Sequence, residues 1–399
     1  MNDLSESVQR NRRPAARASG TKKSRPSARS AVVKDNEASY AAPQAEVVQR
    51  EMIASPALKG RAGNVHTKTT STPRARATKK TPQEDEVSVL NHGDATVLIT
   101  GICGRMGRLL ARQLHRQMRV IGVDRRRFDG KPEDIVHHQI DLRRRKFRDV
   151  LKTEKVSAVV HLGTMHNLRE SDRMHHVWNV VGFQKLLEHV AQFRVPKLVV
   201  LSSASLYGPS PDNPQFLSED APLLGAQEFS QIRDLVEVDM LAQSFFWKEP
   251  KVETVILRPC HILGRVRNAP SNYIRMERPI TVMGFDPMMQ VIHERDVIDA
   301  IMLSLREGVR GVYNLRGPGE LPLSRMLTML GKQPLSLPGP LVRGVLGRLW
   351  SYRAVNFPTP ELDHLRYLCM VDGRRARDEL GFSPRHSLEE TLRAPLSDR

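Results

Sequence analysis

The stretch TVLITGICGRMGRLLARQLHR, residues 96–116, decides the fold of this chain. It begins as a short run of β-branched and apolar residues, passes through three glycines and continues with apolar residues at helical spacing. A strand, a glycine-rich turn and a helix in this order are typical of a phosphate-binding turn, because free N–H groups of the helix N-terminus face the anion. Gly101 permits the tight turn, Gly104 lets the backbone approach a pyrophosphate, and Gly107 lets helix and strand pack closely.

Asp124 ends the next β-branched run, RVIGVD, roughly twenty residues beyond the glycines. A carboxylate at this place accepts hydrogen bonds from the adenosine ribose of NAD and repels the 2′-phosphate of NADP. An arginine among Arg125 to Arg127 could instead hold that phosphate, so the sequence favours NAD and leaves NADP open. A purely structural turn that binds no nucleotide is the less favoured interpretation of the glycine loop.

The pattern of the first strand and helix repeats along the chain. Further β-branched runs at 119–124, 137–141, 157–162, 197–202 and 253–258 alternate with segments of helical periodicity. Strands that read as continuous apolar runs are buried on both faces, and strand–helix alternation implies parallel strands with right-handed crossovers. We therefore predict an α/β fold, a doubly wound parallel sheet of the Rossmann type.

Three regions follow from these patterns. We expect a disordered basic tail over 1–92, an NAD(P)-binding Rossmann domain over 93–264 and a mainly substrate-binding domain over 265–399. The last region loses the regular alternation and is rich in Pro and Gly, but residues near 290–316 should return to the first domain. The smaller domain should cover the carboxyl edge of the sheet, where ligands of such folds bind.

The chain is strongly basic. Its formal net charge is +18, and residues 1–86 hold 17 Lys/Arg against 9 Asp/Glu, with Tyr40 as the one aromatic residue. Such a segment buries too little apolar surface to offset its chain entropy. Its basic runs would suit a nucleic-acid arm, but a solvated linker is favoured because aromatic platforms for bases are missing. The basic body suits phosphorylated ligands.

The cysteines indicate a reducing compartment, because Cys103, Cys260 and Cys369 are too far apart for a CxxC site. The sequence has no apolar run of 18 or more residues and no signal-peptide core, so we expect no transmembrane segment and a cytoplasmic protein. No other histidine stands at metal-ligand spacing from His166, and no metal is expected.

Seven short motifs in order resemble those of the extended short-chain dehydrogenase/reductases. They are the glycine loop, Asp124, DL at 141–142, HLG at 161–163, NVVG at 179–182, LSSASLYG at 201–208 and LRPCHILG at 257–264. Within that superfamily the chain resembles the NAD-dependent epimerase/dehydratase family, in particular a bacterial subgroup called UDP-glucose 4-epimerase-like. The likeness covers residues from about 96 to about 384 and leaves the tail out.

The resemblance implies a cofactor site and a catalytic site. The cofactor residues that it implies are Gly101, Cys103, Gly104, Arg105, Met106, Gly107, Asp124, Arg125, Asp141, Leu142, Leu162, Gly163, Arg233 and Pro259. It further implies that Ser203 hydrogen-bonds the reacting oxygen, that Asn179 braces the site and that Tyr207 lies on the substrate side. His293 and Asp296 belong to a segment that would shape the ligand pocket.

The catalytic tyrosine and lysine of that family, four residues apart, are missing. Their positions fall on Phe229 and Arg233, and no tyrosine of the chain has a lysine four residues on. Phenylalanine has no exchangeable proton, and a guanidinium stays protonated, although Arg233 could still bind the nicotinamide ribose. Tyr207 and His166 are alternative bases, but a wall residue and a plain cleft residue are the favoured interpretations.

The resulting hypothesis is an NAD(P)-binding protein of the epimerase/dehydratase type with an atypical active site. It would act on, or only bind, a nucleotide sugar or a similar phosphorylated ligand. Two alternatives stay open: a non-catalytic dinucleotide-binding regulatory or scaffold protein, and a nucleic-acid-associated protein that works through residues 1–86. A homodimer is also compatible with the sequence.

Overall fold

A computed structural model of the chain describes residues 95–397, apart from 166–169, 228–229, 343, 345–347 and 349–362. The predicted tail, 1–92, therefore lies outside the described residues. So do Phe229 and His166.

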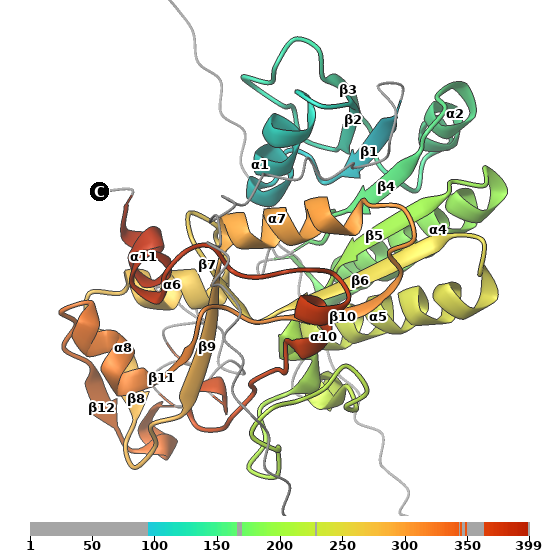
Figure 1. Cartoon of the computed structure of the whole chain (residues 1–399). Helices are drawn as coiled ribbons and strands as arrows, with labels where there is room; N and C mark the ends of the chain where they lie inside the picture. Colours follow the sequence, from blue (N-terminus) through green and yellow to red (C-terminus); the bar gives the residue numbers. More distant parts are fainter. Residues whose placement is uncertain are drawn as a thin grey trace, which may run out of the picture. The chain divides into compact units, whose positions relative to one another are not determined.

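Seven parallel strands form the central sheet, in the order β10-β6-β5-β4-β1-β2-β3 (Figure 1). The strands are β1 Thr96–Thr100, β2 Arg119–Asp124, β3 Val136–Gln139, β4 Ala158–His161, β5 Lys197–Leu201, β6 Glu253–Pro259 and β10 Gly311–Leu315. The six strands that the sequence predicts are β1 to β6, and the predicted doubly wound parallel sheet is confirmed.

Helices cover both faces of the sheet (Figure 1). They are α1 Arg105–Leu114 and α7 Glu294–Ser304 on one face, and α2 Arg145–Thr153, α4 Gly182–Gln192 and α5 Ser230–Lys248 on the other. Successive side chains of a strand point to opposite faces. Val97 and Ile99 of β1 therefore belong to the core under α1 and α7, whereas Leu98 belongs to the core under the other three helices.

The strand order reverses at β1. From β1 the chain builds the sheet outward to β2 and β3, then crosses back to place β4 on the other side of β1. At such a switch point the loops that leave the two neighbouring strands diverge and open a crevice at their carboxyl ends. The glycine loop follows β1 and the residues from Leu162 follow β4, so both lie at this switch point.

A second core lies in the C-terminal part of the chain. It is built by the helices α6 Ala269–Arg275, α8 Leu323–Met329 and α11 Leu388–Arg393 and by the short strands β7 His261–Leu263, β8 Ile280–Val282, β9 Met288–His293, β11 Glu320–Pro322 and β12 Leu335–Leu337. These strands form a three-stranded sheet, β11-β9-β7, and a pair, β12-β8. Residues 294–315 supply α7 and β10, so this part of the chain returns to the main sheet.

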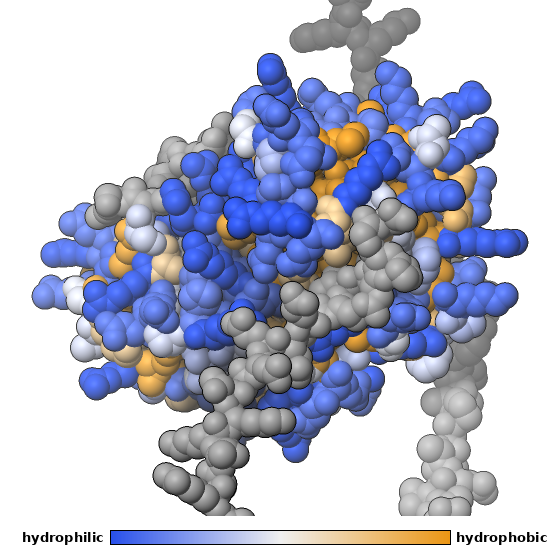
Figure 2. Space-filling view, turned by 45° about the horizontal axis from the view of Figure 1, so that its top comes forward, coloured by the Kyte–Doolittle hydropathy of each residue, from blue (hydrophilic) through white to orange (hydrophobic). Residues whose placement is uncertain are grey.

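The surface is mainly polar on the face seen in Figure 2, where hydrophobic residues form small separate patches. Within the described ranges, no helix is long and apolar enough to cross a membrane.

A buried ion pair fastens α5 to the sheet. Arg258 of β6 and Asp239 of α5 are 1% and 0% exposed, and they bond through Nε–Oδ2 at 3.0 Å and Nη2–Oδ1 at 2.7 Å. Nη1 of Arg258 also donates to the hydroxyl of Tyr207 at 2.8 Å, and that hydroxyl donates to Asn314 of β10 at 2.8 Å. Each buried polar group thus has partners that offset the cost of removing it from water.

Breaking this pair should strongly destabilise the fold. Asp239→Leu leaves the Arg258 guanidinium buried without a counter-charge, so we expect the free energy of unfolding to fall by about 3–5 kcal/mol. Urea unfolding of the full chain measures it. The control is Arg393→Ala, which removes an exposed pair with Glu389 and should change stability by less than about 0.5 kcal/mol. Similar losses in both variants would contradict the role of the buried pair.

Candidate functional site

The glycine loop is closely packed against its neighbours. Gly101 has a φ of +74°, and a Cβ there would lie 2.7 Å from Cα of Gly163, so the loops after β1 and β4 touch. A Cβ at Gly107 would lie 2.5 Å from the carbonyl oxygen of Gly101. At Gly104 the nearest backbone atom would be 3.2 Å away. The loop is therefore least crowded at Gly104, where the sequence places the pyrophosphate.

The N-terminus of α1 is free to bind an anion. Gly104 is its N-cap residue, no side chain caps it, and its first turn holds no acidic residue. The first N–H groups of a helix have no partner within the helix, and their dipoles favour negative charge. These residues therefore fit the pyrophosphate of a dinucleotide.

The side chains of the loop are engaged elsewhere. Arg105 donates to Glu294, the first residue of α7, at 2.6 Å, and Met106 packs against the core. Burial and the neighbouring Asp124 raise the pKa of the Cys103 thiol to about 11, so it stays protonated at neutral pH. The side chains of these three residues are therefore not directed to a ligand, and the backbone N–H of Cys103 donates to Asp124 at 3.0 Å.

Asp124 and Asp141 lie in matching turns, in which each accepts hydrogen bonds from the arginine two residues on. Asp124 bonds the backbone N–H of Arg126 at 3.0 Å and its Nη2 at 3.0 Å. Asp141 bonds the backbone N–H of Arg143 at 2.9 Å and its Nη2 at 2.6 Å. Burial alone would raise the pKa of both carboxyl groups, but the arginine hydrogen bonds hold it below the usual value. Both groups therefore stay ionised.

Two arginines next to these turns contact the same aromatic ring. The guanidinium groups of Arg125 and Arg143 both lie over the ring of Trp178. Leu142 is half-buried and packs against the core. The hydrogen bonds from arginine to both carboxylates were not predicted from the sequence. The Asp-x-Arg spacing at 124–126 and 141–143 was the pattern that could have indicated them.

Asn179 fixes the loop after β4. It is buried in a π-helical turn, η1 (Val177–Val181), a feature that is frequent at functional sites. Its Oδ1 accepts from the backbone N–H of Met165 at 2.8 Å, and its Nδ2 donates to the carbonyl of Met165 at 3.3 Å. Asn179 thus holds the segment that begins with Leu162 and Gly163.

Ser203 is half-buried at the start of a short 3-10 helix, η2 (Ala204–Tyr207). Its Oγ accepts from the backbone N–H of Ser205 at 3.1 Å and keeps its own proton free to donate. The neighbouring Ser202 donates to Asp239, so the buried ion pair also anchors this serine loop.

Tyr207 is 1% exposed, and its hydroxyl is held by Arg258 and Asn314. Burial raises the pKa of this phenol above its ordinary value. A buried phenol hydroxyl that makes two hydrogen bonds and has a raised pKa is poorly suited to abstract a proton. The arrangement favours the structural interpretation of Tyr207 over that of a relocated base.

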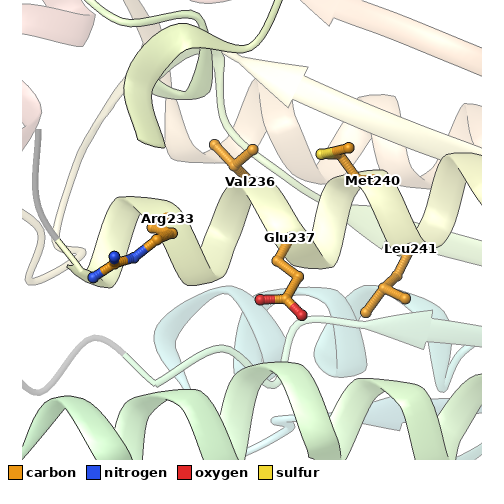
Figure 3. A pocket seen from close by; sticks show the side chains of 5 residues that line it. All are labelled: Arg233, Val236, Glu237, Met240 and Leu241. Carbon is orange, nitrogen blue, oxygen red and sulfur yellow. The ribbon is translucent and has the colours of Figure 1, made fainter. Parts of the chain in front are cut away.

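Arg233 is exposed on α5 and borders an open hollow of about 390 Å³. The hollow is lined by Arg233, Val236, Glu237, Met240 and Leu241 (Figure 3). Asp239, which faces the serine loop, is six residues further, so its side chain points about 120° away around the helix axis. Between α5 and η2 the packing is apolar, with Ile232 against Leu206. This geometry does not turn Arg233 toward Ser203.

Three other residues of the resembling motifs have structural partners. Pro259 is the buried last residue of β6. His293 caps α7 by accepting from the backbone N–H of Arg295. Asp296 is fully buried and accepts from the ring of His386 at 2.7 Å. Asp296 therefore ties the C-terminal segment to α7.

One cluster was not visible in the sequence. The side chains of His176, Asp234 and Glu237 converge, with potential ligand atoms within 4.8 Å of one another. Nδ1 of His176 lies 3.0 Å from Asp234 and 3.9 Å from Glu237. The hydrogen bond between His176 and the buried Asp234 explains why these side chains lie together.

The sequence profile of the NAD dependent epimerase/dehydratase family matches residues 97–315, more than half of the chain. The chain belongs to this family. A UDP-glucuronate 4-epimerase of Thermodesulfobacterium geofontis is 31% identical over 75% of this chain and 94% of its own. An uncharacterised protein of Mycobacterium tuberculosis is 28% identical over 74% of this chain and 82% of its own.

The fold of this family member also matches solved structures. A UDP-glucuronic acid 4-epimerase from Bacillus cereus in complex with NAD superposes with a TM-score of 0.59 at 17% identity, over 75% of this chain and 96% of that one. The matched region of the family profile contains the glycine loop, Asn179, Ser203 and the dyad positions.

The site also contains a histidine whose protonation should affect stability. His161 at the end of β4 is 3% exposed, and its Nδ1 lies 2.8 Å from Oγ1 of Thr100. Burial lowers the pKa of His161 to about 4. In the unfolded chain the pKa is about 6.5, so protons bind the unfolded state first as the pH falls.

The contribution of His161 to stability should be complete above about pH 6.5 and be lost as the pH falls toward 4, by up to about 1.4 kcal/mol per unit. His161→Asn removes the titration, and its free energy of unfolding should fall less steeply with acid over this window. Urea unfolding at pH 7, 6 and 5 compares the two proteins. Equal slopes would show that His161 is not the titrating group.

Proposed function

We propose that this family member binds a pyridine dinucleotide, NAD(H) or its 2′-phosphorylated form, at the carboxyl ends of β1 and β4. The observation that carries the proposal is the uncapped N-terminus of α1, which begins behind Gly104, the least crowded of the three loop glycines. Backbone N–H groups there would hold the pyrophosphate, and the loop from Leu162 to Met165, fixed by Asn179, would pass the nicotinamide half. When bound, the nicotinamide supplies a hydride acceptor or donor.

A second ligand, a nucleotide sugar or a similar phosphorylated molecule, would bind beside the nicotinamide. The family membership and the basic body, with its formal excess of Lys and Arg, support this class of ligand. The free proton of Ser203 would be donated to the oxygen of the ligand. The smaller C-terminal region would supply most of the remaining contacts.

We further propose that the site is atypical and lacks the usual proton-transfer pair. Oxidation of a sugar hydroxyl needs a base as hydride leaves, and Phe229 and Arg233 cannot serve as one. The exposed position of Arg233 and the buried hydroxyl of Tyr207 support this interpretation. Loss of such a group commonly lowers the rate by two to four decades, as a rough estimate.

The non-catalytic alternative is a regulatory or scaffold protein that binds the dinucleotide and turns nothing over. A nucleic-acid role rests on residues 1–86, which lie outside the described residues, and stays a prediction. A homodimer and a cytoplasmic location likewise stay predictions.

Binding tests the first proposal. Millimolar NADH or NADPH should raise the melting temperature of the full chain, because a ligand that binds only the folded state stabilises it. Gly104→Val should abolish this shift by filling the pyrophosphate position. Gly319→Val is the control, since a Cβ at Gly319 would meet no atom within 4 Å. A chain that shows no shift with either nucleotide would refute the proposed site.

Turnover tests the second proposal. The wild-type chain should bind cofactor yet show little or no 4-epimerase or dehydratase activity with UDP- or GDP-sugars. Phe229→Tyr combined with Arg233→Lys should leave dinucleotide affinity nearly unchanged, and a gain of activity in this variant would identify a silenced dehydrogenase site. Robust wild-type turnover would instead show that another residue acts as base, and Tyr207→Phe and His166→Ala would then be assayed.

A further inference from the structure

Three side chains converge where the short helix α3, Asp172–His176, meets α5. His176 ends α3, and Asp234 and Glu237 are three residues apart on α5, so both face the same side of that helix. Nδ1 of His176 lies 3.0 Å from Oδ1 of Asp234 and 3.9 Å from Oε2 of Glu237. One imidazole and two carboxylates from two helices thus surround a common point.

Asp234 is a buried carboxylate with few partners. It is 5% exposed, and in the part of the chain that the structure describes its one hydrogen-bond partner is His176. A carboxylate accepts up to about four hydrogen bonds, and a buried one normally has a counter-charge. His176 bonds Oδ1, which leaves Oδ2 of Asp234 available to a further ligand.

The charge around Asp234 and Glu237 is not balanced by a lysine or arginine. Among the described residues, no such side chain forms an ion pair with either carboxylate. Arg233, the neighbour of Asp234 in the sequence, points toward the start of α5 and away from Glu237 (Figure 3). Other acidic groups of the chain are paired with arginines, namely Asp124, Asp141, Asp239 and Glu294. The cluster therefore carries negative charge that a bound cation would balance.

We propose that His176, Asp234 and Glu237 bind a divalent transition-metal ion, for which Zn²⁺ is the probe. Zn²⁺ binds imidazole nitrogen and carboxylate oxygen at about 2.0–2.2 Å in a tetrahedron, so its ligand atoms are about 3.3–3.6 Å apart. The observed separations of 3.0 and 3.9 Å lie on either side of this range, so small side-chain rotations suffice. An imidazole ligand favours a transition metal over Mg²⁺ or Ca²⁺, which prefer oxygen.

The surroundings leave room for a fourth ligand and a path for the ion. The side chains of His176 and Glu237 are 48% and 44% exposed, so water reaches the side of the cluster opposite Asp234. Three protein ligands with a water in the fourth position form a common zinc geometry. The proposed metal site is independent of the proposed dinucleotide site and goes beyond that function.

The ion joins α3 to α5 next to the segment that carries Asn179. His176 directly precedes the turn η1, in which Asn179 holds the loop after β4. Because a metal bond replaces a hydrogen bond to a single exposed histidine, the bound ion stabilises the folded chain and fastens η1 to α5. Its role at this position is structural.

Zn²⁺ titration of the full chain after treatment with a chelator, followed by calorimetry, tests the site. His176→Gln should weaken Zn²⁺ binding by about tenfold or more. Glu237→Gln is the sharper variant, because it removes a ligand at a partly exposed position and keeps the hydrogen bond between His176 and Asp234. It should weaken binding by about tenfold as well.

The matched control is His115→Gln. His115 and Asp134 form a His–Asp hydrogen bond of the same length, 3.0 Å, but within the described residues no third ligand groups with them. This variant should change Zn²⁺ affinity by less than about twofold. Equal Zn²⁺ affinity in the wild-type chain and Glu237→Gln, or no binding to the wild-type chain, overturns the inference and leaves a plain hydrogen-bonded pair.

Thermal unfolding gives a second measurement. Zn²⁺ should raise the melting temperature of the wild-type chain and of His115→Gln by mass action, and the shift should be lost in Glu237→Gln. Mg²⁺ at the same concentration should give no shift, and equal stabilisation by Mg²⁺ would overturn the assignment to a transition metal. None of these outcomes affects the proposed binding of a dinucleotide, which is measured separately.

Discussion

The buried ion pair between Arg258 and Asp239 is the interaction on which the rest of the site depends. It joins β6, near one edge of the sheet, to α5, the helix that carries Arg233, and through Ser202 it reaches the serine loop. Two charges without water are tolerated only because Tyr207, Ser202 and other neighbours complete their hydrogen bonds. The pair therefore determines which face of α5 is turned toward Ser203.

That constraint explains the position of Arg233 on α5. With Asp239 turned inward, Arg233 is about a third of a turn away and exposed. The side of α5 that packs on the serine loop is apolar at Ile232. An apolar contact supplies neither a proton acceptor nor a charge at this place.

At the carboxyl ends of β1 and β4 the proposed binding groups are mostly backbone. Glycines bring the loop after β1 against the loop after β4, and the side chain of Arg105 turns to Glu294 instead of the crevice. The side chains that do face the adenosine end are arginines held on Asp124 and Asp141. Short turns therefore fix the positions of these arginine side chains.

The sequence by itself determined the strands β1 to β6, the glycine loop and the family, because periodicity and glycine spacing are properties of contiguous residues. It also drew attention to Asn179 and Ser203, since each stands in a short motif, and their site roles stay predictions. The partners of the charged groups were decided by the tertiary structure: Arg258 meets Asp239, and Arg105 meets Glu294, 189 residues away. Periodicity places a residue on a face of its own element, but a buried charge finds its counter-charge only when distant elements pack together.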